Sequence, residues 1–249
     1  MVSLSLHQLS ARYGRRQILD EITTPTFHGG QVVALLGPNA AGKSTLFRRI
    51  FGVLKGPGEI RLEGARRERP MAYMTQDNGA SAVLTVYEAV LLARMQGRGM
   101  KVQPGDLTQV ERALDELGIS ALGERDIGDL SGGQRQMVNA AQALVQEPEV
   151  LLLDEPTSAL DLHRQVGLLT ILRRLARERS MLILVAMHDL GQALRFTDQA
   201  MLLEQGRLVA CGPTPDVVTS ELVEKVYRVR ARIEPCSKGQ PQLIVEAAI

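Results

Sequence analysis

The segment Gly37-Pro38-Asn39-Ala40-Ala41-Gly42-Lys43-Ser44, followed by Thr45, decides the fold because it matches the pattern G-x-x-x-x-G-K-[ST] in full. The apolar run at residues 31–36 precedes it and is typical of a strand buried in a parallel sheet. Residues 44–51 follow with apolar positions at helical spacing. A glycine-rich turn between a strand and a helix presents backbone N–H groups to a phosphate. The sequence therefore predicts a phosphate-binding loop in an α/β protein.

Two side chains of this loop predict nucleotide chemistry. Lys43 would place its ammonium group on the β- and γ-phosphates, and the Ser44 hydroxyl would bind Mg²⁺. A chance glycine-rich turn is the alternative, but the flanking strand and helix favour the phosphate-binding interpretation. We therefore expect the residues from Gly37 to Thr45 to contact the nucleotide, with Lys43 also acting in catalysis.

A second buried strand ends in two carboxylates. Residues 150–153 are all apolar, and Asp154 and Glu155 follow them directly. Ligands of open α/β sheets sit outside the carboxyl ends of the strands, so both side chains are expected beside the phosphates. Asp154 would hold the Mg²⁺ shell, and Glu155 would orient or deprotonate the attacking water. Acidic residues often follow strands, so the two carboxylates alone are weak evidence for a nucleotide site. Together with Lys43 in one parallel sheet they become strong evidence for it.

The region between the two motifs is predicted to be a helical insertion. Thr85 and Glu88 have the spacing of a capping box, Asp106 is expected to cap a second helix, and Gly118 to end it. We expect one domain over residues 1–249, with a helical subdomain at about 84–134. Further helices are predicted at residues 134–146, 162–178 and 219–227, and strands at residues 3–9, 181–187, 198–204, 207–211 and 243–246.

Length and composition exclude several classes of protein. A chain of 249 residues is long enough for one large domain. Its 29 Lys+Arg against 28 Asp+Glu, with no Trp, give neither the charge nor the stacking surfaces of a nucleic-acid-binding protein. Cys211 and Cys236 belong to no Cys/His cluster, so neither a disulfide framework nor a zinc site is expected. The longest apolar run, residues 181–187, is far shorter than the roughly 20 residues that span a bilayer, and no signal peptide is expected.

The segment Leu130-Ser131-Gly132-Gly133-Gln134 adds the signature LSGGQ to these motifs. With it, the chain resembles the nucleotide-binding subunit of ABC (ATP-binding cassette) transporters. The resemblance implies a P-loop NTPase (RecA-like) core with an antiparallel β subdomain and a small α-helical insertion. It also implies ATP and Mg²⁺ as cofactors, and ATP hydrolysis coupled to transport. In the family this signature faces the γ-phosphate held by the other subunit, so Ser131, Gly132, Gly133 and Gln134 would bind nucleotide across a head-to-tail homodimer.

Four further positions match the family. Tyr13 is similar to the aromatic residue that stacks on adenine, and Gln76 to the glutamine that contacts Mg²⁺ or the attacking water. Asp161 is similar to the aspartate of the D-loop, a turn at the dimer interface, and His188 to the histidine that contacts the γ-phosphate. Without the family resemblance, Tyr13 would be interpreted as an ordinary aromatic residue of a strand, and Gln76 would have no assignable role. Asp161 would be interpreted as a helix cap, and His188 as a capping or core histidine. Ala40 departs from the pattern, because glycine is frequent at that position, and Ala186-Met187 replaces small hydroxylated residues before His188.

The resemblance also implies partners and a direction of transport. A separate membrane permease would carry the cargo, a substrate-binding protein would act indirectly, and the chain would lie peripherally on the cytoplasmic face of the bacterial inner membrane. Residues 188–198 and 206–227 are similar to importers of ferric siderophores, haem and vitamin B12. We expect ferric siderophore uptake, with a haem, cobalamin or other importer and an exporter as alternatives. A non-transport ABC ATPase would need a coiled coil or a DNA-binding domain, and a P-loop kinase would lack LSGGQ.

Overall fold

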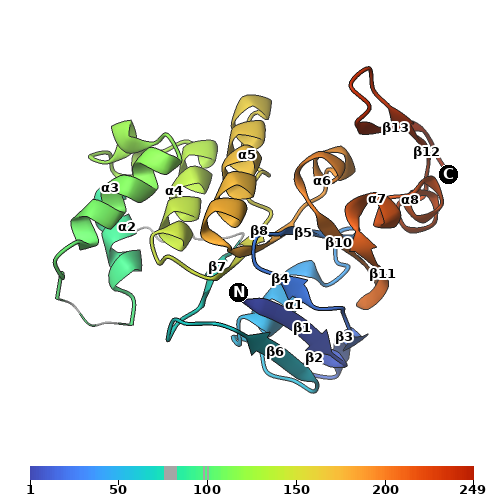
Figure 1. The fold of residues 1–249 in the computed structure, drawn as a ribbon, viewed down its shortest axis with the longest axis horizontal. Helices are drawn as coiled ribbons and strands as arrows, with labels where there is room; N and C mark the ends of the chain where they lie inside the picture. The colour runs from blue at the N-terminus through green and yellow to red at the C-terminus, as the bar shows by residue number, and fades with distance from the viewer. Residues whose placement is uncertain (76–82, 98, 100) are drawn as a thin grey trace.

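A six-stranded sheet forms the centre of the described structure, a computed structural model that covers residues 1–75, 83–97, 99 and 101–249 (Figure 1). Its order is β11-β10-β5-β9-β8-β7, and all neighbours are parallel except the pair β10–β11. Parallel strands need crossover connections, which the helices supply. The strands are β5 (Val32–Leu36), β7 (Met71–Met74), β8 (Val150–Asp154), β9 (Leu182–Ala186), β10 (Gln199–Glu204) and β11 (Arg207–Pro213).

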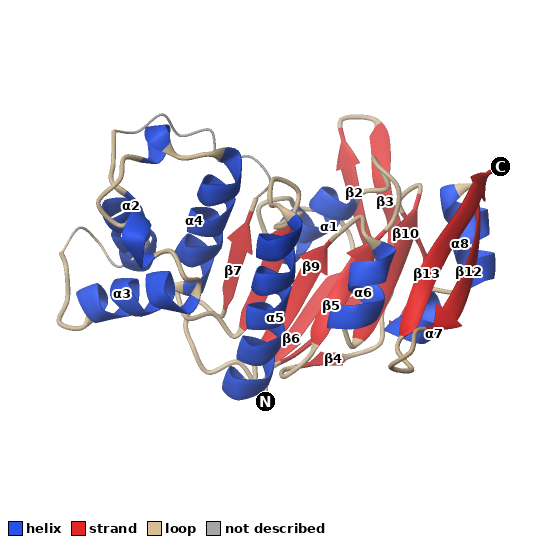
Figure 2. Ribbon diagram, turned by 90° about the horizontal axis from the view of Figure 1, so that it is seen from above, coloured by secondary structure: helices blue, strands red, loops and turns tan. Residues whose placement is uncertain are grey.

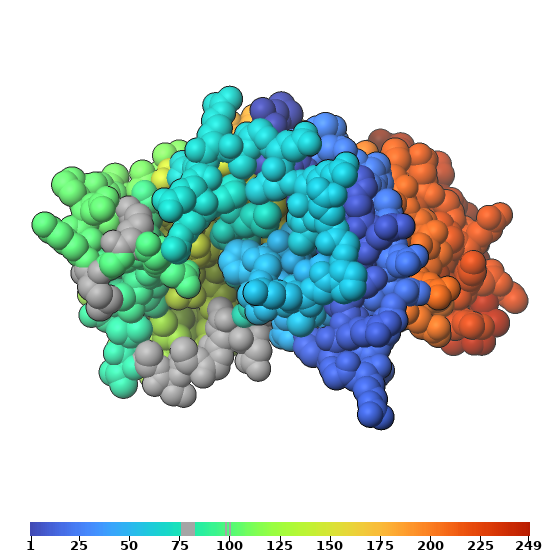
Figure 3. Space-filling view, turned by 90° about the horizontal axis from the view of Figure 1, so that it is seen from below, coloured from blue at the N-terminus to red at the C-terminus, as the bar shows by residue number. Residues whose placement is uncertain are grey.

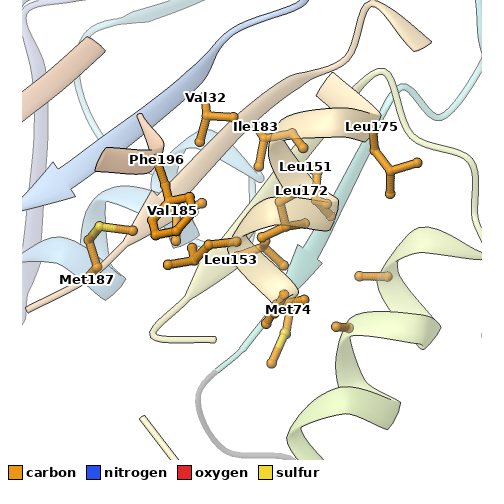
Figure 4. Close-up of a cluster of buried hydrophobic side chains, with 14 of the residues drawn as sticks. Val32, Met74, Leu151, Leu153, Leu172, Leu175, Ile183, Val185, Met187 and Phe196 are labelled. Atoms are coloured by element: carbon orange, nitrogen blue, oxygen red, sulfur yellow. The ribbon is translucent and has the colours of Figure 1, made fainter. Parts of the chain in front are cut away.

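The central strands are buried on both faces, which explains their continuous apolar sequences. Every residue of β5, β8 and β9 is buried. Because side chains alternate along a strand, Val32 and Ile183 join one hydrophobic cluster, whereas Val33 and Leu182 join the cluster on the opposite face. Figure 4 shows the first cluster, in which Leu172 of α5 (Leu162–Arg179) packs against the sheet. The predicted parallel α/β core is confirmed.

Helices α5 and α6 (Leu190–Phe196) cover one face of this sheet, and helix α1 (Lys43–Ile50) and the antiparallel strands cover the other. Figure 2 shows α5 and α6 in front of the central strands, with α1 behind them. The face that carries α1 also carries two antiparallel sheets, with orders β4-β1-β6 and β2-β3. Figure 3 shows this N-terminal part of the chain, in blue to cyan, covering the middle of the molecule. Its strands are β1 (Ser3–His7), β2 (Leu9–Tyr13), β3 (Arg16–Ile22), β4 (Phe27–His28) and β6 (Glu59–Glu63).

The helical segment lies beyond the β7 edge of the sheet, as Figures 1 and 2 show. Its helices are α2 (Val86–Met95), α3 (Asp106–Glu116) and α4 (Gly132–Leu144), with 3₁₀ turns at Ser120–Leu122 and Ile127–Asp129. The predicted capping box of α2 is confirmed: the Thr85 side chain accepts from the Glu88 N–H, and the Glu88 carboxylate accepts from the Thr85 N–H.

Two helix starts differ from the sequence prediction. Asp106 does not cap α3; Gly105, in a left-handed conformation (φ 90°), holds that place. The buried Asp106 carboxylate instead pairs with Arg94 at 3.2 Å, and this charge pairing fixes its position. Helix α4 begins at Gly132, two residues before the predicted start, because Ser131 and Gln134 form a capping box.

The C-terminal region holds the helix predicted at residues 219–227, and also helix α7 (Thr214–Val217) and strand β12 (Val229–Pro235), which the sequence did not indicate. Helices α7 and α8 (Ser220–Tyr227) lead into a hairpin of β12 and β13 (Pro241–Ala248). Strand β13 extends beyond the predicted residues 243–246, and β12 was not predicted because charged residues interrupt its apolar positions. In the described part of the chain, no helix combines the length and the hydropathy needed to cross a membrane.

Candidate active site

The loop between β5 and α1 has a backbone that requires glycine at two positions. Gly37 has φ 145° and Gly42 has φ 105°, values that other residues rarely adopt. A Cβ atom at Gly37 would lie 2.3 Å from the carbonyl oxygen of Leu203, and one at Gly42 would lie 2.8 Å from the Leu19 side chain. The loop therefore packs closely against β10 and β3. No side chain caps α1, whose first N–H groups face the loop.

Ala40 adopts the left-handed conformation in this loop, with φ 61°. Glycine reaches this region without strain, whereas a residue with a Cβ atom pays about 1–2 kcal/mol. This strain explains why glycine is frequent at the position, and the surrounding loop holds Ala40 in place nevertheless.

The Lys43 ammonium group lies inside the loop. Its Nζ atom donates to the carbonyl oxygens of Gly37 at 2.8 Å and Pro38 at 3.2 Å. Burial lowers the pKa of Lys43, while the charges of Glu155 and Asp154 act in the opposite direction. Two nearby carboxylates thus favour the charged form of this lysine, which is the form that attracts a phosphate.

A cavity of about 600 Å³ opens beside the loop. The residues that line it come from β3, from the loop and start of α1, and from the ends of β8 and β9. Thus residues 39–45, Glu155 and His188 share one cavity, although the last two are far from the loop in sequence. Arg16 and Ile18 also line the cavity and were not predicted; neither lies in a motif that identifies it.

Asp154 is almost completely buried at the end of β8, with 1% of its surface exposed. Its Oδ2 atom accepts a hydrogen bond from the Tyr73 hydroxyl at 3.1 Å. Burial raises the pKa of Asp154, although the nearby hydroxyl groups of Ser44 and Tyr73 lower it in part. The Oδ1 atom is buried and has no hydrogen-bond partner among the described residues. A partnerless carboxylate oxygen beside the Ser44 hydroxyl fits Mg²⁺, which binds hard oxygen ligands.

Glu155 and His188 lie at the ends of adjacent strands and contact each other. The distance between Glu155 Oε1 and His188 Nε2 is 2.5 Å. Glu155 has φ 52°, a left-handed conformation that turns the chain away from the direction of β8. Hydrogen bonds hold its backbone: its N–H donates to the carbonyl of Ala186, and its carbonyl accepts from Gln136 Nε2 at 2.8 Å and from the N–H and hydroxyl of Ser158.

Gln136 was not identified from the sequence, yet it connects the LSGGQ helix to the backbone of Glu155. It lies on α4, is buried, and reaches across from the helix to the strand end. A glutamine inside an ordinary helical pattern carries no sequence signal, so this contact could not have been foreseen.

Tyr13, Asp161 and the residues of the LSGGQ segment do not line the cavity. Tyr13, at the end of β2, is 45% exposed, and its hydroxyl accepts from Arg48 Nη1 at 3.4 Å. Ser131 and the residues that follow it begin α4 at a separate place from the Lys43 loop, and none of them is among the residues that line the cavity. Asp161 caps α5, its carboxylate accepting from the Arg164 N–H at 2.9 Å. Gln76 lies outside the described residues.

The chain is similar to known ATP-binding subunits along most of its length. Residues 19–158 match the ABC transporter family. The iron(3+)-hydroxamate import ATP-binding protein FhuC of Bacillus subtilis is 35% identical over 244 residues, covering 94% of this chain and 90% of FhuC. The hemin import ATP-binding protein HmuV of Bradyrhizobium diazoefficiens is 36% identical over 261 residues, covering 98% and 95%. Among solved structures, one described as an inward-facing metal-chelate type ABC transporter has a TM-score of 0.87 at 26% identity, covering 99% and 98%.

Proposed function

Because this chain belongs to the ABC transporter family as an ATP-binding importer subunit, we propose that its ATP hydrolysis drives the uptake of a ferric siderophore. ATP binding and transport-coupled ATP hydrolysis come with membership of the family. What we propose beyond this membership is the identity of the cargo, the identity of the metal and the role of each residue in the site. The observation that supports these roles best is the cavity shared by residues 39–45, Glu155 and His188.

In this proposal the loop residues Gly37, Pro38, Asn39, Ala40, Ala41, Gly42, Lys43, Ser44 and Thr45 bind the phosphates. Lys43 exchanges its carbonyl partners for the β- and γ-phosphate oxygens, and the backbone N–H groups at the start of α1 complete the contact. Tyr13 leaves a large exposed surface on which adenine can stack. All of these contacts position the nucleotide before any bond is broken.

Ser44, Asp154 and Gln76 are the proposed ligands of Mg²⁺. The Ser44 hydroxyl and Asp154 Oδ1 are available oxygens on neighbouring elements, and Asp154 can also act through a bound water. When bound, Mg²⁺ would neutralise charge on the phosphate oxygens.

Glu155 is the proposed general base, and His188 the residue that contacts the γ-phosphate. Glu155 Oε1 borders the cavity, so it can accept a proton from the attacking water. His188 Nε2 lies within hydrogen-bonding distance of the same oxygen and can orient it. Gln76 is proposed to take part in catalysis beside them, as its family position implies.

The LSGGQ segment is proposed to complete the site of a second copy of this chain. Ser131, Gly132, Gly133 and Gln134 form a helix start, exposed at its first two residues and half-buried at the next two, that lies apart from the cavity of their own chain. A head-to-tail homodimer would bring each helix start to the γ-phosphate held by the other copy. The two copies would close when both sites hold ATP and reopen after hydrolysis.

The remaining partners follow from the same proposal. Permease subunits would dock beside the helical segment at residues 84–134, so the chain would lie on the cytoplasmic face of the bacterial inner membrane. A substrate-binding protein would act through the permease. Two relatives act on iron(3+)-hydroxamate and hemin, and a third match is described as a metal-chelate type transporter. These names support an iron chelate as cargo, and a haem importer is the favoured alternative.

Growth on defined iron sources tests the cargo. A strain that lacks the chain should fail to grow when a ferric hydroxamate is the only iron source, and should grow normally on haem. Restoring the chain should restore growth, whereas the Lys43→Ala variant should not. Loss of growth on haem alone would replace the siderophore assignment with haem import. Normal growth on both sources would overturn uptake of an iron chelate.

A further inference from the structure

The hydroxyl group of Tyr73 contacts Asp154, the most buried carboxylate of the site. Tyr73 lies on β7, the strand next to β8, where the parallel register pairs it with Leu152. This register brings its side chain to the end of β8, and its hydroxyl donates to Asp154 Oδ2 at 3.1 Å. Tyr73 belongs to none of the motifs that identify the ATP site, and it does not line the cavity.

Two aromatic rings of the α1 region fix the ring of Tyr73. Phe47, fully buried on α1, meets it edge-on with the ring centres 6.2 Å apart. Phe51, the residue that ends α1, lies 5.6 Å away at a tilt of 52°. Contacts of this kind favour defined ring geometries. The phenol oxygen is therefore held at one place by the helix that follows the phosphate loop.

The bond to Tyr73 occupies one oxygen of Asp154 and leaves the other without a partner. Oδ2 accepts from the phenol, while Oδ1 is buried and unpaired among the described residues. A carboxylate that is tethered through one oxygen presents the other in a fixed direction. Such outer contacts orient the groups that bind metals directly and influence their affinity.

We propose that Tyr73 is a positioning residue, whose hydroxyl holds Asp154 so that Oδ1 is directed to the metal of the ATP site. The inference rests on the proposed function of that site, and it adds a residue of β7 that does not itself touch nucleotide or metal.

The test is the affinity of the full-length protein for Mn²⁺ in the presence of a non-hydrolysable ATP analogue, measured by electron paramagnetic resonance. Tyr73→Phe keeps the ring and its aromatic contacts but removes the donor. We expect the dissociation constant for Mn²⁺ to rise roughly tenfold or more, while metal-free nucleotide affinity stays within about twofold. Tyr87→Phe, which removes a hydroxyl on α2, is the matched control and should leave Mn²⁺ affinity unchanged.

A double-mutant cycle separates positioning from a general loss of structure. In the Asp154→Asn background, adding Tyr73→Phe should change Mn²⁺ affinity by less than about twofold, because the residue through which it acts is already altered. Equal affinity of Tyr73→Phe and the parent would overturn the inference. A Tyr73→Phe protein that no longer folds would also overturn it, since the contact would then be structural. A parent protein that binds no Mn²⁺ with nucleotide would instead refute the proposed function.

Discussion

His188 Nε2 lies 2.5 Å from Glu155 Oε1, and this contact joins the ends of two adjacent strands of the central sheet. The two residues are separated by a helix and a strand in sequence, yet they meet at the cavity because β8 and β9 are parallel neighbours. The proposed base and the proposed γ-phosphate contact therefore share one hydrogen bond. A substitution at either residue will alter the orientation of the other.

Glu155→Gln should abolish hydrolysis and retain ATP binding. The amide keeps the size of the side chain but cannot accept a proton from water, and loss of a general base typically lowers a rate by about 10²–10⁴-fold. Single-turnover hydrolysis and size-exclusion chromatography with ATP should show slow turnover and a trapped dimer. Glu178→Gln, on the exposed face of α5, is the matched control. Hydrolysis by Glu155→Gln at the parental rate would refute the proposed role.

Lys43→Ala should lose nucleotide binding. The substitution removes the ammonium group that lies inside the loop, together with its charge-assisted hydrogen bonds to phosphate. At about 1.5–3 kcal/mol for hydrogen bonds to a charged group, ATP affinity should fall by more than about tenfold, as measured by calorimetric titration. The thermal unfolding temperature without nucleotide provides the control for folding. Unchanged ATP affinity would contradict the proposed phosphate contact.

Ser131→Arg should spare ATP binding and abolish turnover. The residue lies outside the cavity of its own chain, so ATP affinity of the isolated subunit should stay within about twofold. The arginine would remove the capping hydroxyl of α4 and obstruct the approach of a second copy. Parental hydrolysis should also rise more than linearly with protein concentration. A rate per molecule that is independent of concentration would exclude a shared site.

Asp154→Asn should stabilise the protein in the absence of nucleotide, in a way that depends on pH. Burial raises the pKa of Asp154 above its usual 3.8, so the folded state binds this proton more tightly than the unfolded state does. Stability is therefore lost as the pH rises from 3.8 through the folded-state pKa. Since about 1 kcal/mol corresponds to roughly 2–4 °C in a chain of this size, the variant should melt a few degrees higher at pH 7.

The measurement for Asp154→Asn is thermal unfolding across a pH series. Its advantage over the parent should shrink as the pH falls toward the folded-state pKa. Adding Mg²⁺ and ATP should raise the melting temperature of the parent more than that of the variant. A variant that melts lower than the parent at neutral pH would show that the carboxylate stabilises the fold, contrary to the direction of its pKa.

The central sheet and the phosphate loop could be predicted because their signals are local. Continuous apolar runs identified β5, β8 and β9, and the glycine pattern identified the loop between β5 and α1. Helix α6 was missed because its seven residues are too few for a helical period to stand out, and Gly191 interrupts them. Strand β12 was missed because it is mostly exposed and pairs only with β13 among the described strands.

The contacts that complete the site depend on register, which the sequence does not show. Tyr73 reaches Asp154 only because β7 pairs with β8 in one particular alignment. Gln136 reaches the Glu155 carbonyl only because α4 packs at one angle against the strand end. Arg16 lies at the cavity because β3 folds back beside the loop. The prediction for Gln76 stays a prediction, because the residue lies outside the described part of the chain.

The close approaches behind the phosphate loop have a consequence for ligand binding. Main-chain atoms and a leucine side chain occupy the space where Cβ atoms at Gly37 and Gly42 would stand, and the carbonyl of Ile18 does the same at Gly206. Two other segments of the chain thus pack against the loop, and the loop keeps its curved conformation without a bound nucleotide. The loop therefore loses little conformational entropy when ATP binds. The affinity for ATP is then set by the contacts between loop and nucleotide, with little free energy spent on ordering the loop.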